Sequence, residues 1–71
     1  MLVADRAVVE WTQQLRAEYV EMPGLSLTKE QMLRLWRLDR PLCDAVVAAL
    51  VASGFLERRP DDVYVRRSAR L

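Results

Sequence analysis

Apolar residues recur at three- and four-residue steps in the first part of the chain, as on one side of an amphipathic helix. Asp5 offers a capping side chain before this pattern. Pro23 ends the pattern because the residue before a proline is pushed away from helical geometry, and Gly24 completes the break. The pattern predicts a helix over residues 5–21. Its apolar stripe is formed by Val8, Trp11, Leu15 and Tyr19, and Ala4 and Met22 extend it.

A short alternating segment and a second amphipathic helix are expected next. Residues 25–27 alternate as a strand does. Thr28 and Gln31 have the spacing of a capping box, in which the Thr28 hydroxyl accepts from the Gln31 amide and the Gln31 side chain reaches back. The second helix is predicted over residues 28–37. Its inner face is formed by Met32, Leu35 and Trp36.

A third helix is predicted over residues 40–53, after a tight turn. Asp39 offers a capping carboxylate, and Pro41 is tolerated in a first helical turn because the amides there have no helical partner. Gly54 stands where a left-handed cap residue is expected. One arc of this helix is apolar and predicts a core face, formed by Cys43, Val46, Val47, Leu50 and Val51.

The last part of the chain predicts a β-hairpin over residues 55–67. Two segments that favour extended structure flank the turn-forming residues 60–62. Tyr64 is expected to pack the hairpin onto the third helix, which we prefer to a hydroxyl contact with phosphate. The chain is therefore expected to be a single domain over residues 1–71, mainly α with a small β-hairpin.

Candidate catalytic chemistry is scarce. The 71 residues include one cysteine and no histidine, so a zinc site of the usual kind cannot form within one chain. The sequence has no Gly-rich phosphate loop and no nucleophile with a neighbouring base. We expect neither an enzyme nor a cofactor or metal site. Cys43 lies in the apolar arc, which favours a buried structural thiol over a redox sensor.

Charge and hydropathy say less about partners. The net charge is +1, but the last six residues hold three arginines and no acid, and such a field can help dock a phosphate backbone. The longest uncharged segment, residues 45–56, is too short to span a bilayer. The amino end lacks the layout of a secretory signal. We expect a soluble, cytoplasmic protein with no membrane contact.

The order of helix, short strand, helix, tight turn, helix and hairpin is that of a winged helix-turn-helix, with a wing of two or three strands. The supporting residues are Leu27-Thr28, Leu35, Leu38-Asp39 and the segments 50–58 and 61–64. On these residues the chain resembles the DNA-binding domains of bacterial transcriptional regulators of the isocitrate-lyase-repressor and multiple-antibiotic-resistance-regulator types. The resemblance covers about forty residues, and winged helices also bind proteins and RNA.

The resemblance implies a docking mode on double-stranded DNA and a regulatory role. The third helix would lie in the major groove, the hairpin over a minor groove or backbone, and the start of the second helix against phosphate. Thr28 and Lys29 would contact phosphate, and Arg40 would touch the backbone or a guanine edge. The wing contact would be formed by Arg58, Arg59, Arg66 and Arg67.

The third helix departs from the pattern of such regulators, whose exposed positions usually carry polar or basic side chains. Alanine cannot donate the bidentate hydrogen bonds that distinguish guanine or adenine, so little sequence preference is expected. The alternative hypothesis is that this face docks a protein or a second copy of the chain. A homodimer through the first helix is also expected, with Val9 and Val20 at its seam. The alternative protein-binding face consists of Pro41, Leu42, Ala45, Ala48 and Ala52.

Overall fold

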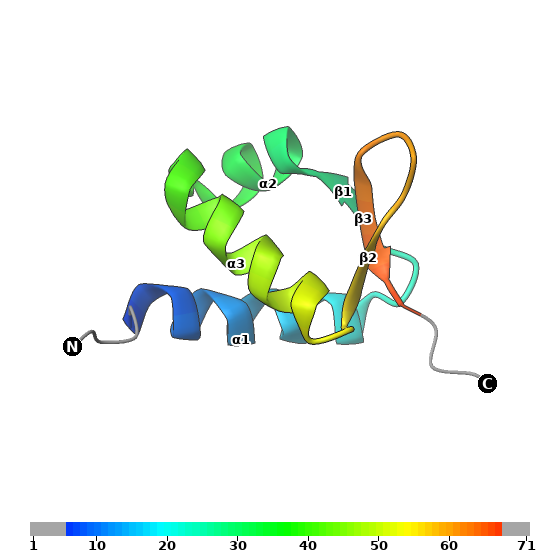
Figure 1. Ribbon diagram of the computed structural model, residues 1–71, viewed down its shortest axis with the longest axis horizontal. Coiled ribbons are helices and arrows are strands. Elements are labelled where there is room, and N and C mark those ends of the chain that lie inside the picture. Colours follow the sequence, from blue (N-terminus) through cyan, green and yellow to red (C-terminus); the bar gives the residue numbers. More distant parts are fainter. Residues whose placement is uncertain (1–5, 68–71) are drawn as a thin grey trace.

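The computed structural model describes residues 6–67 and contains three helices and a small antiparallel sheet (Figure 1). The predicted fold class, mainly α with a small hairpin, is confirmed. Asp5, Ala4 and Arg70 lie outside the described residues. In chain order the elements are α1 (Arg6–Glu21), β1 (Ser26–Thr28), α2 (Lys29–Trp36), α3 (Arg40–Ala52), β2 (Leu56–Arg58) and β3 (Val63–Arg66).

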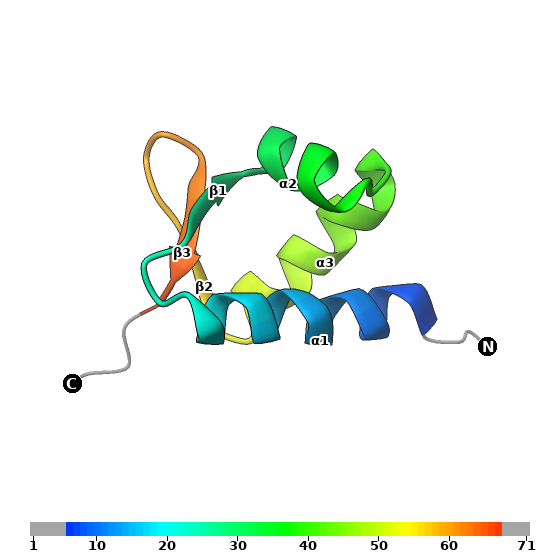
Figure 2. The same cartoon turned by 180° about the vertical axis from the view of Figure 1, so that it is seen from behind.

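The sheet connects the first half of the chain to the hairpin. Its strand order is β1-β3-β2, and both pairings are antiparallel. Leu27 of β1 faces Tyr64 of β3, and Tyr64 in turn faces Arg58 of β2. The hairpin stands beside the three helices in both views, with α3 lying across α1 (Figures 1 and 2). This arrangement is compatible with a winged helix.

The local signals at the helix ends are confirmed. Thr28 and Gln31 form both halves of the capping box, and the Asp39 carboxylate accepts from the Leu42 amide at 3.0 Å. Gly54 follows α3 with a φ of 84°, a conformation that glycine adopts without steric cost. The second helix ends at Trp36 because Arg37 is left-handed, with a φ of 54°.

The core lies where α1, α3 and the sheet meet. Half-buried Trp11, Trp36 and Phe55 pack against its edge. Cys43 is a buried free thiol whose pKa burial raises, as expected of a structural cysteine. The buried set consists of Leu15, Tyr19, Met32, Leu38, Cys43, Val46, Val47, Leu50, Leu56 and Tyr64.

Three predicted core positions are wrong. Leu35 is 58% exposed, because α2 turns Met32 inward and half-buries Leu33 and Trp36, which leaves Leu35 beyond the edge of the buried face. Met22 is exposed because it follows the last helical residue. Val51 is exposed at the margin of the α3 arc. The short strand also begins one residue later than predicted, at Ser26.

Tyr19 joins α1 to the hairpin. Its hydroxyl donates to the backbone carbonyl of Tyr64 at 2.8 Å, a buried contact between residues 45 positions apart. Its ring meets the ring of Phe55 edge to face, with centroids 6.5 Å apart. Burial raises the pKa of Tyr19 from 10.0 to about 12. This one side chain therefore fixes the hairpin to the helices by a hydrogen bond and by ring packing.

Replacing Tyr19 with phenylalanine removes only the hydroxyl. We expect Tyr19→Phe to lower the free energy of unfolding by about 1–2 kcal/mol at pH 7, because the buried carbonyl loses a donor. Urea denaturation followed by circular dichroism measures the change. Tyr64→Phe is the matched control, since the Tyr64 hydroxyl forms no hydrogen bond within residues 6–67. Equal losses in the two variants would contradict the assigned role.

The same variant has a pH signature. Because the folded state raises the pKa of Tyr19, the proton contributes stability that is complete below pH 10 and is lost as the pH rises towards 12. The difference in unfolding free energy between the wild type and Tyr19→Phe should therefore shrink over that range. A constant difference up to pH 12 would show that Tyr19 is not desolvated.

Candidate nucleic-acid interface

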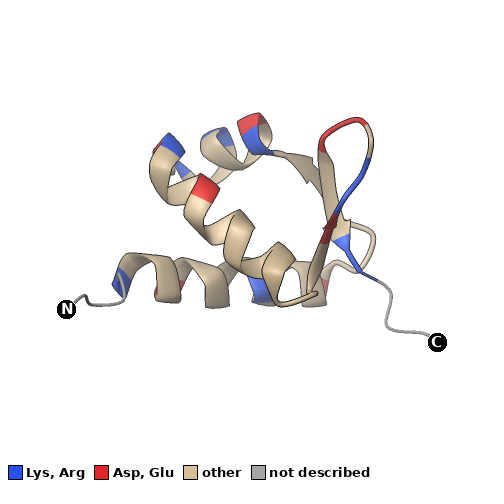
Figure 3. Ribbon diagram, in the orientation of Figure 1, with Lys and Arg blue, Asp and Glu red and all other residues tan. Residues whose placement is uncertain are grey.

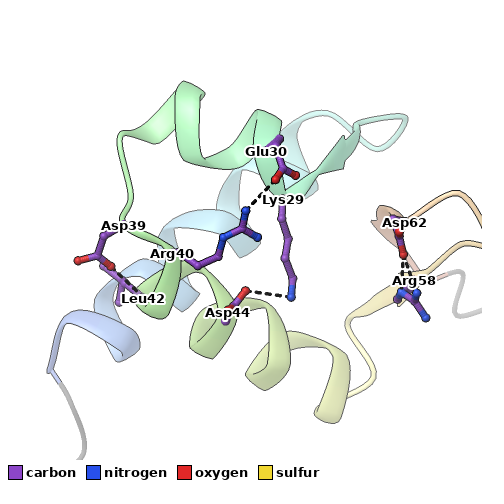
Figure 4. A network of polar contacts seen from close by, with 8 residues as sticks. All are labelled: Lys29, Glu30, Asp39, Arg40, Leu42, Asp44, Arg58 and Asp62. Carbon is purple, nitrogen blue, oxygen red and sulfur yellow. Dashed lines mark hydrogen bonds and ion pairs between the residues drawn. The ribbon is translucent and has the colours of Figure 1, made fainter.

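A polar hollow of about 220 Å³ lies between the start of α2, the start of α3 and the hairpin loop. Thr28 ends β1 and caps α2, which places Lys29 and Glu30 in the first turn of that helix. Asp39 caps α3 and sets Arg40 as its first residue. The hollow is lined by Thr28, Lys29, Glu30, Arg40, Asp62 and Tyr64, and Figure 4 shows most of these side chains from close by.

Lys29 reaches from α2 to α3. Its Nζ lies 3.0 Å from Asp44 Oδ1 (Figure 4). The same atom lies 5.9 Å from the centroid of the Tyr64 ring. The contact with Asp44 is the main cause that raises the pKa of Lys29, and burial opposes it. Asp44 Oδ1 is buried and accepts no hydrogen bond of standard geometry within residues 6–67, so its contact with Lys29 is an ion pair.

Arg40 also pairs across the two helices. Its Nη2 donates to Glu30 Oε2 at 2.7 Å, and both side chains are exposed (Figure 4). This hydrogen bond lowers the pKa of the Glu30 carboxyl and raises the pKa of Arg40. The pair links the starts of α2 and α3 on the surface of the hollow.

The hairpin carries its own ion pairs. Arg58 donates from Nε and Nη2 to Asp62 Oδ1, at 2.9 and 2.6 Å, and this bond raises the pKa of Arg58. Asp62 has a φ of 63°, a left-handed conformation that Asp and Asn tolerate in turns. Arg59 lies 3.9 Å from Glu57, a longer contact. Short acidic and basic blocks follow one another along this ribbon (Figure 3).

The structure brings together only part of the site predicted from the sequence. Thr28, Lys29 and Arg40 line one hollow, and Arg58 is next to it through Asp62. Arg59 lines a separate hollow with Pro60, Asp61, Val63 and Val65. Arg66 and Arg67 lie at the other end of β3, at the base of the hairpin. The Thr28 hydroxyl is already an acceptor in the helix cap.

Three acids form a part of this surface that sequence reasoning missed. Glu30, Asp44 and Asp62 each pair with a cation of the predicted site. The sequence held one signal of these pairs. A lysine in the first turn of a helix opposes the helix dipole, so Lys29 was expected to have a further interaction. The pairings themselves depend on how α2 meets α3, because ten residues separate Glu30 from Arg40.

The outward face of α3 is made of small side chains. Pro41, Ala45, Ala48 and Ala52 are exposed, and Leu42 is half-buried. None of these side chains can hydrogen-bond a base edge. Asp44, the acid next to this face, is half exposed and paired with Lys29.

Comparison of the chain with protein-family models, with curated proteins and with solved structures found no match. Within residues 6–67, no His, Cys, Asp and Glu side chains gather in a group that could hold a metal ion. None of the helices in that part of the chain has the length and apolarity that a bilayer crossing requires.

Proposed function

We propose that the chain binds the sugar–phosphate backbone of nucleic acid, double-stranded DNA above all, with little sequence preference. The observation that carries the proposal is that Lys29 from α2 and Arg40 from α3 line one hollow, with Arg58 of the hairpin next to it through its pair with Asp62. The regulatory role implied by the resemblance to bacterial transcription factors belongs to the same proposal. So does a cytoplasmic location, which suits a chain whose one cysteine is free.

The cations of the hollow can exchange partners. Arg40, Arg58 and their carboxylates are all more than half exposed, and exposed ion pairs contribute little to stability. A backbone phosphate can displace such a carboxylate and accept a bidentate hydrogen bond from the guanidinium. Release of the counterions held by the nucleic acid favours that exchange at low salt. Binding should therefore be weak and strongly dependent on salt.

The α3 face explains why sequence preference should be low. Alanine offers only a methyl group, which can contact thymine but reads neither guanine nor adenine. Ala45, Ala48 and Ala52 occupy the exposed positions that would enter a groove. In this mode the contacts to phosphate position the protein, and the bases are not distinguished.

Removing an acid from the hollow should strengthen binding. In Asp62→Asn the hairpin keeps its left-handed turn, and Arg58 loses its partner. We expect tighter binding to a random DNA duplex at low salt, and a slope of log affinity against log salt that steepens by about 0.9 for each further phosphate that the protein neutralises. Fluorescence anisotropy measures both quantities. Glu30→Gln should act in the same way through Arg40.

Asp61→Asn is the matched control. It makes the same charge change one residue away, at an exposed acid that forms no ion pair within residues 6–67. If Asp61→Asn steepens the salt dependence as much as Asp62→Asn does, net charge alone explains the effect, and the proposed exchange of partners is wrong.

A protein-docking module is the second candidate. The observation that favours it is the small, uncharged face of α3 beside cations that already have acidic partners. Little side-chain entropy is lost when such a face is covered. Pro41, Leu42, Ala45, Ala48 and Ala52 would then contact a protein and not a groove.

Ala48→Glu separates the two candidates. If α3 lies in a groove, the new carboxylate meets phosphates, and we expect duplex affinity to fall about tenfold. Gln14→Glu, at an exposed glutamine of α1, is the control for net charge. Equal duplex affinity in the two variants would rule out α3 as the docking helix and favour the protein-docking candidate.

A homodimer through α1 is a further part of the proposal. Val9 and Val20 are 45% and 50% exposed, and their spacing places them on the same side of the helix. Light scattering at high micromolar concentration should show a species of twice 8.2 kDa. A single species of 8.2 kDa would exclude this dimer.

A further inference from the structure

Two arginines from distant parts of the sequence lie over the ring of Phe55. The guanidinium carbon of Arg16, on α1, is 4.9 Å from the ring centroid, and that of Arg66, on β3, is 5.7 Å away. Such distances are typical of cation–π contacts. Arg16 is inconspicuous in the sequence, because its exposed position on an amphipathic helix suits a solvated charge.

Phe55 is a fixed support. Its amide donates to the Leu50 carbonyl at 3.0 Å, and its carbonyl accepts from the Arg67 amide at 2.8 Å. The edge-to-face contact with buried Tyr19 holds the ring itself. The two guanidinium groups therefore lie over a ring that is held by α3, by α1 and by the residue that follows β3.

No acid forms an ion pair with these arginines within residues 6–67. Lys29, Arg40 and Arg58 each have an acidic partner, whereas none of the ion pairs in that part of the chain includes Arg16, Arg66 or Arg67. Two like charges close to one ring repel each other. An anion that contacts both guanidinium groups would relieve that repulsion. Along the ribbon, the basic positions at the base of the hairpin and in the middle of α1 are separate from the charged positions at the starts of α2 and α3 (Figure 3).

We propose that Arg16 and Arg66, supported by Phe55, form a phosphate-binding site at the base of the hairpin. A guanidinium presents parallel N–H donors that match phosphate oxygens, and stacking on a ring fixes the plane of the donors before the anion arrives. Phosphate suits two guanidinium groups better than a single carboxylate does. A free phosphate or a phosphomonoester carries a charge of about −1.5 to −2 and at least three acceptor oxygens at neutral pH, and so can serve both arginines. A phosphodiester of a nucleic-acid strand carries a single charge and two unesterified oxygens, so that one oxygen can face each guanidinium.

The site is distinct from the hollow between α2, α3 and the hairpin loop, with which it shares no residue. It stands whether or not that hollow binds nucleic acid. The phosphate can belong to a nucleic-acid strand or be free in solution. Arg16 lies between Val9 and Val20 on the same side of α1, so a dimer through that side would cover the site. Phosphate binding and that dimer therefore exclude each other.

The test uses two probes, inorganic phosphate and a random DNA duplex, with the full chain. Nitrogen-15 NMR follows the side-chain Nε–Hε signals of the arginines as phosphate is added, against chloride at equal ionic strength. Fluorescence anisotropy measures binding of the duplex. Arg16→Gln removes one guanidinium, and Arg34→Gln, at an exposed arginine of α2 that forms no ion pair within residues 6–67, removes an equal charge elsewhere.

We expect phosphate to shift the Arg16 and Arg66 signals more than the Arg34 signal. For at least one probe, Arg16→Gln should bind roughly tenfold more weakly than Arg34→Gln, as the loss of a charged hydrogen bond predicts. Arg16→Lys keeps the charge without the planar donors and should fall between the wild type and Arg16→Gln. A loss seen with phosphate assigns the site to the free anion, and a loss seen only with duplex assigns it to a strand.

The proposal is overturned if Arg16→Gln and Arg34→Gln bind both probes equally. It is also overturned if Arg16→Gln binds as the wild type does and only its thermal unfolding changes, because Arg16 would then serve packing alone. If Arg16→Gln weakens duplex binding while Asp62→Asn behaves as Asp61→Asn does, this site stands and the proposed role of the hollow fails.

Discussion

The hairpin is held against the rest of the fold by the pairing of β3 with β1 and by one buried polar contact to the helices, the hydrogen bond from the Tyr19 hydroxyl to the Tyr64 carbonyl. A chain this small buries only a modest core. The hairpin has one strand of three residues and one of four, so buried apolar area alone is not enough to attach it. Tyr19 supplies both parts of the attachment. Its ring adds to the apolar core and meets Phe55, and its hydroxyl satisfies a carbonyl of the central strand. Phe55 is held in turn, and with it the two arginines that rest on its ring.

The surface cations fall into two groups: those that form an ion pair with an acid and those that do not. Around the hollow, each cation meets a carboxylate on a neighbouring element, so the field there is small although the charges are many. At the base of the hairpin, Arg16 and Arg66 share a ring and have no acidic partner in the described part of the chain. A net charge of +1 conceals this difference. An incoming phosphate must displace a carboxylate at the first place but meets uncompensated arginines at the second.

The features that could be predicted from sequence are those that short-range chemistry fixes. The capping box of Thr28 and Gln31 spans three residues, and Gly54 follows the last turn of its own helix, so both are visible in the sequence. The pairs Lys29–Asp44 and Arg40–Glu30 depend on how α2 packs against α3. No local pattern in the sequence encodes that packing. The prediction that Leu35 lies in the core is wrong for the same reason. On a helix of eight residues, the identity of the neighbouring elements decides which edge of the apolar face is covered.

In this structure α1 and the hairpin form one body joined through Tyr19 and Phe55. Solution NMR tests this most directly, through nuclear Overhauser contacts of the Tyr19 ring and the exchange of the hairpin amides with solvent. We predict contacts from the Tyr19 ring to the Phe55 ring, with the amide of Arg67, which donates to Phe55, exchanging as slowly as those of α3. Absence of those contacts, together with hairpin amides that exchange as in an unfolded chain, would contradict the joined arrangement.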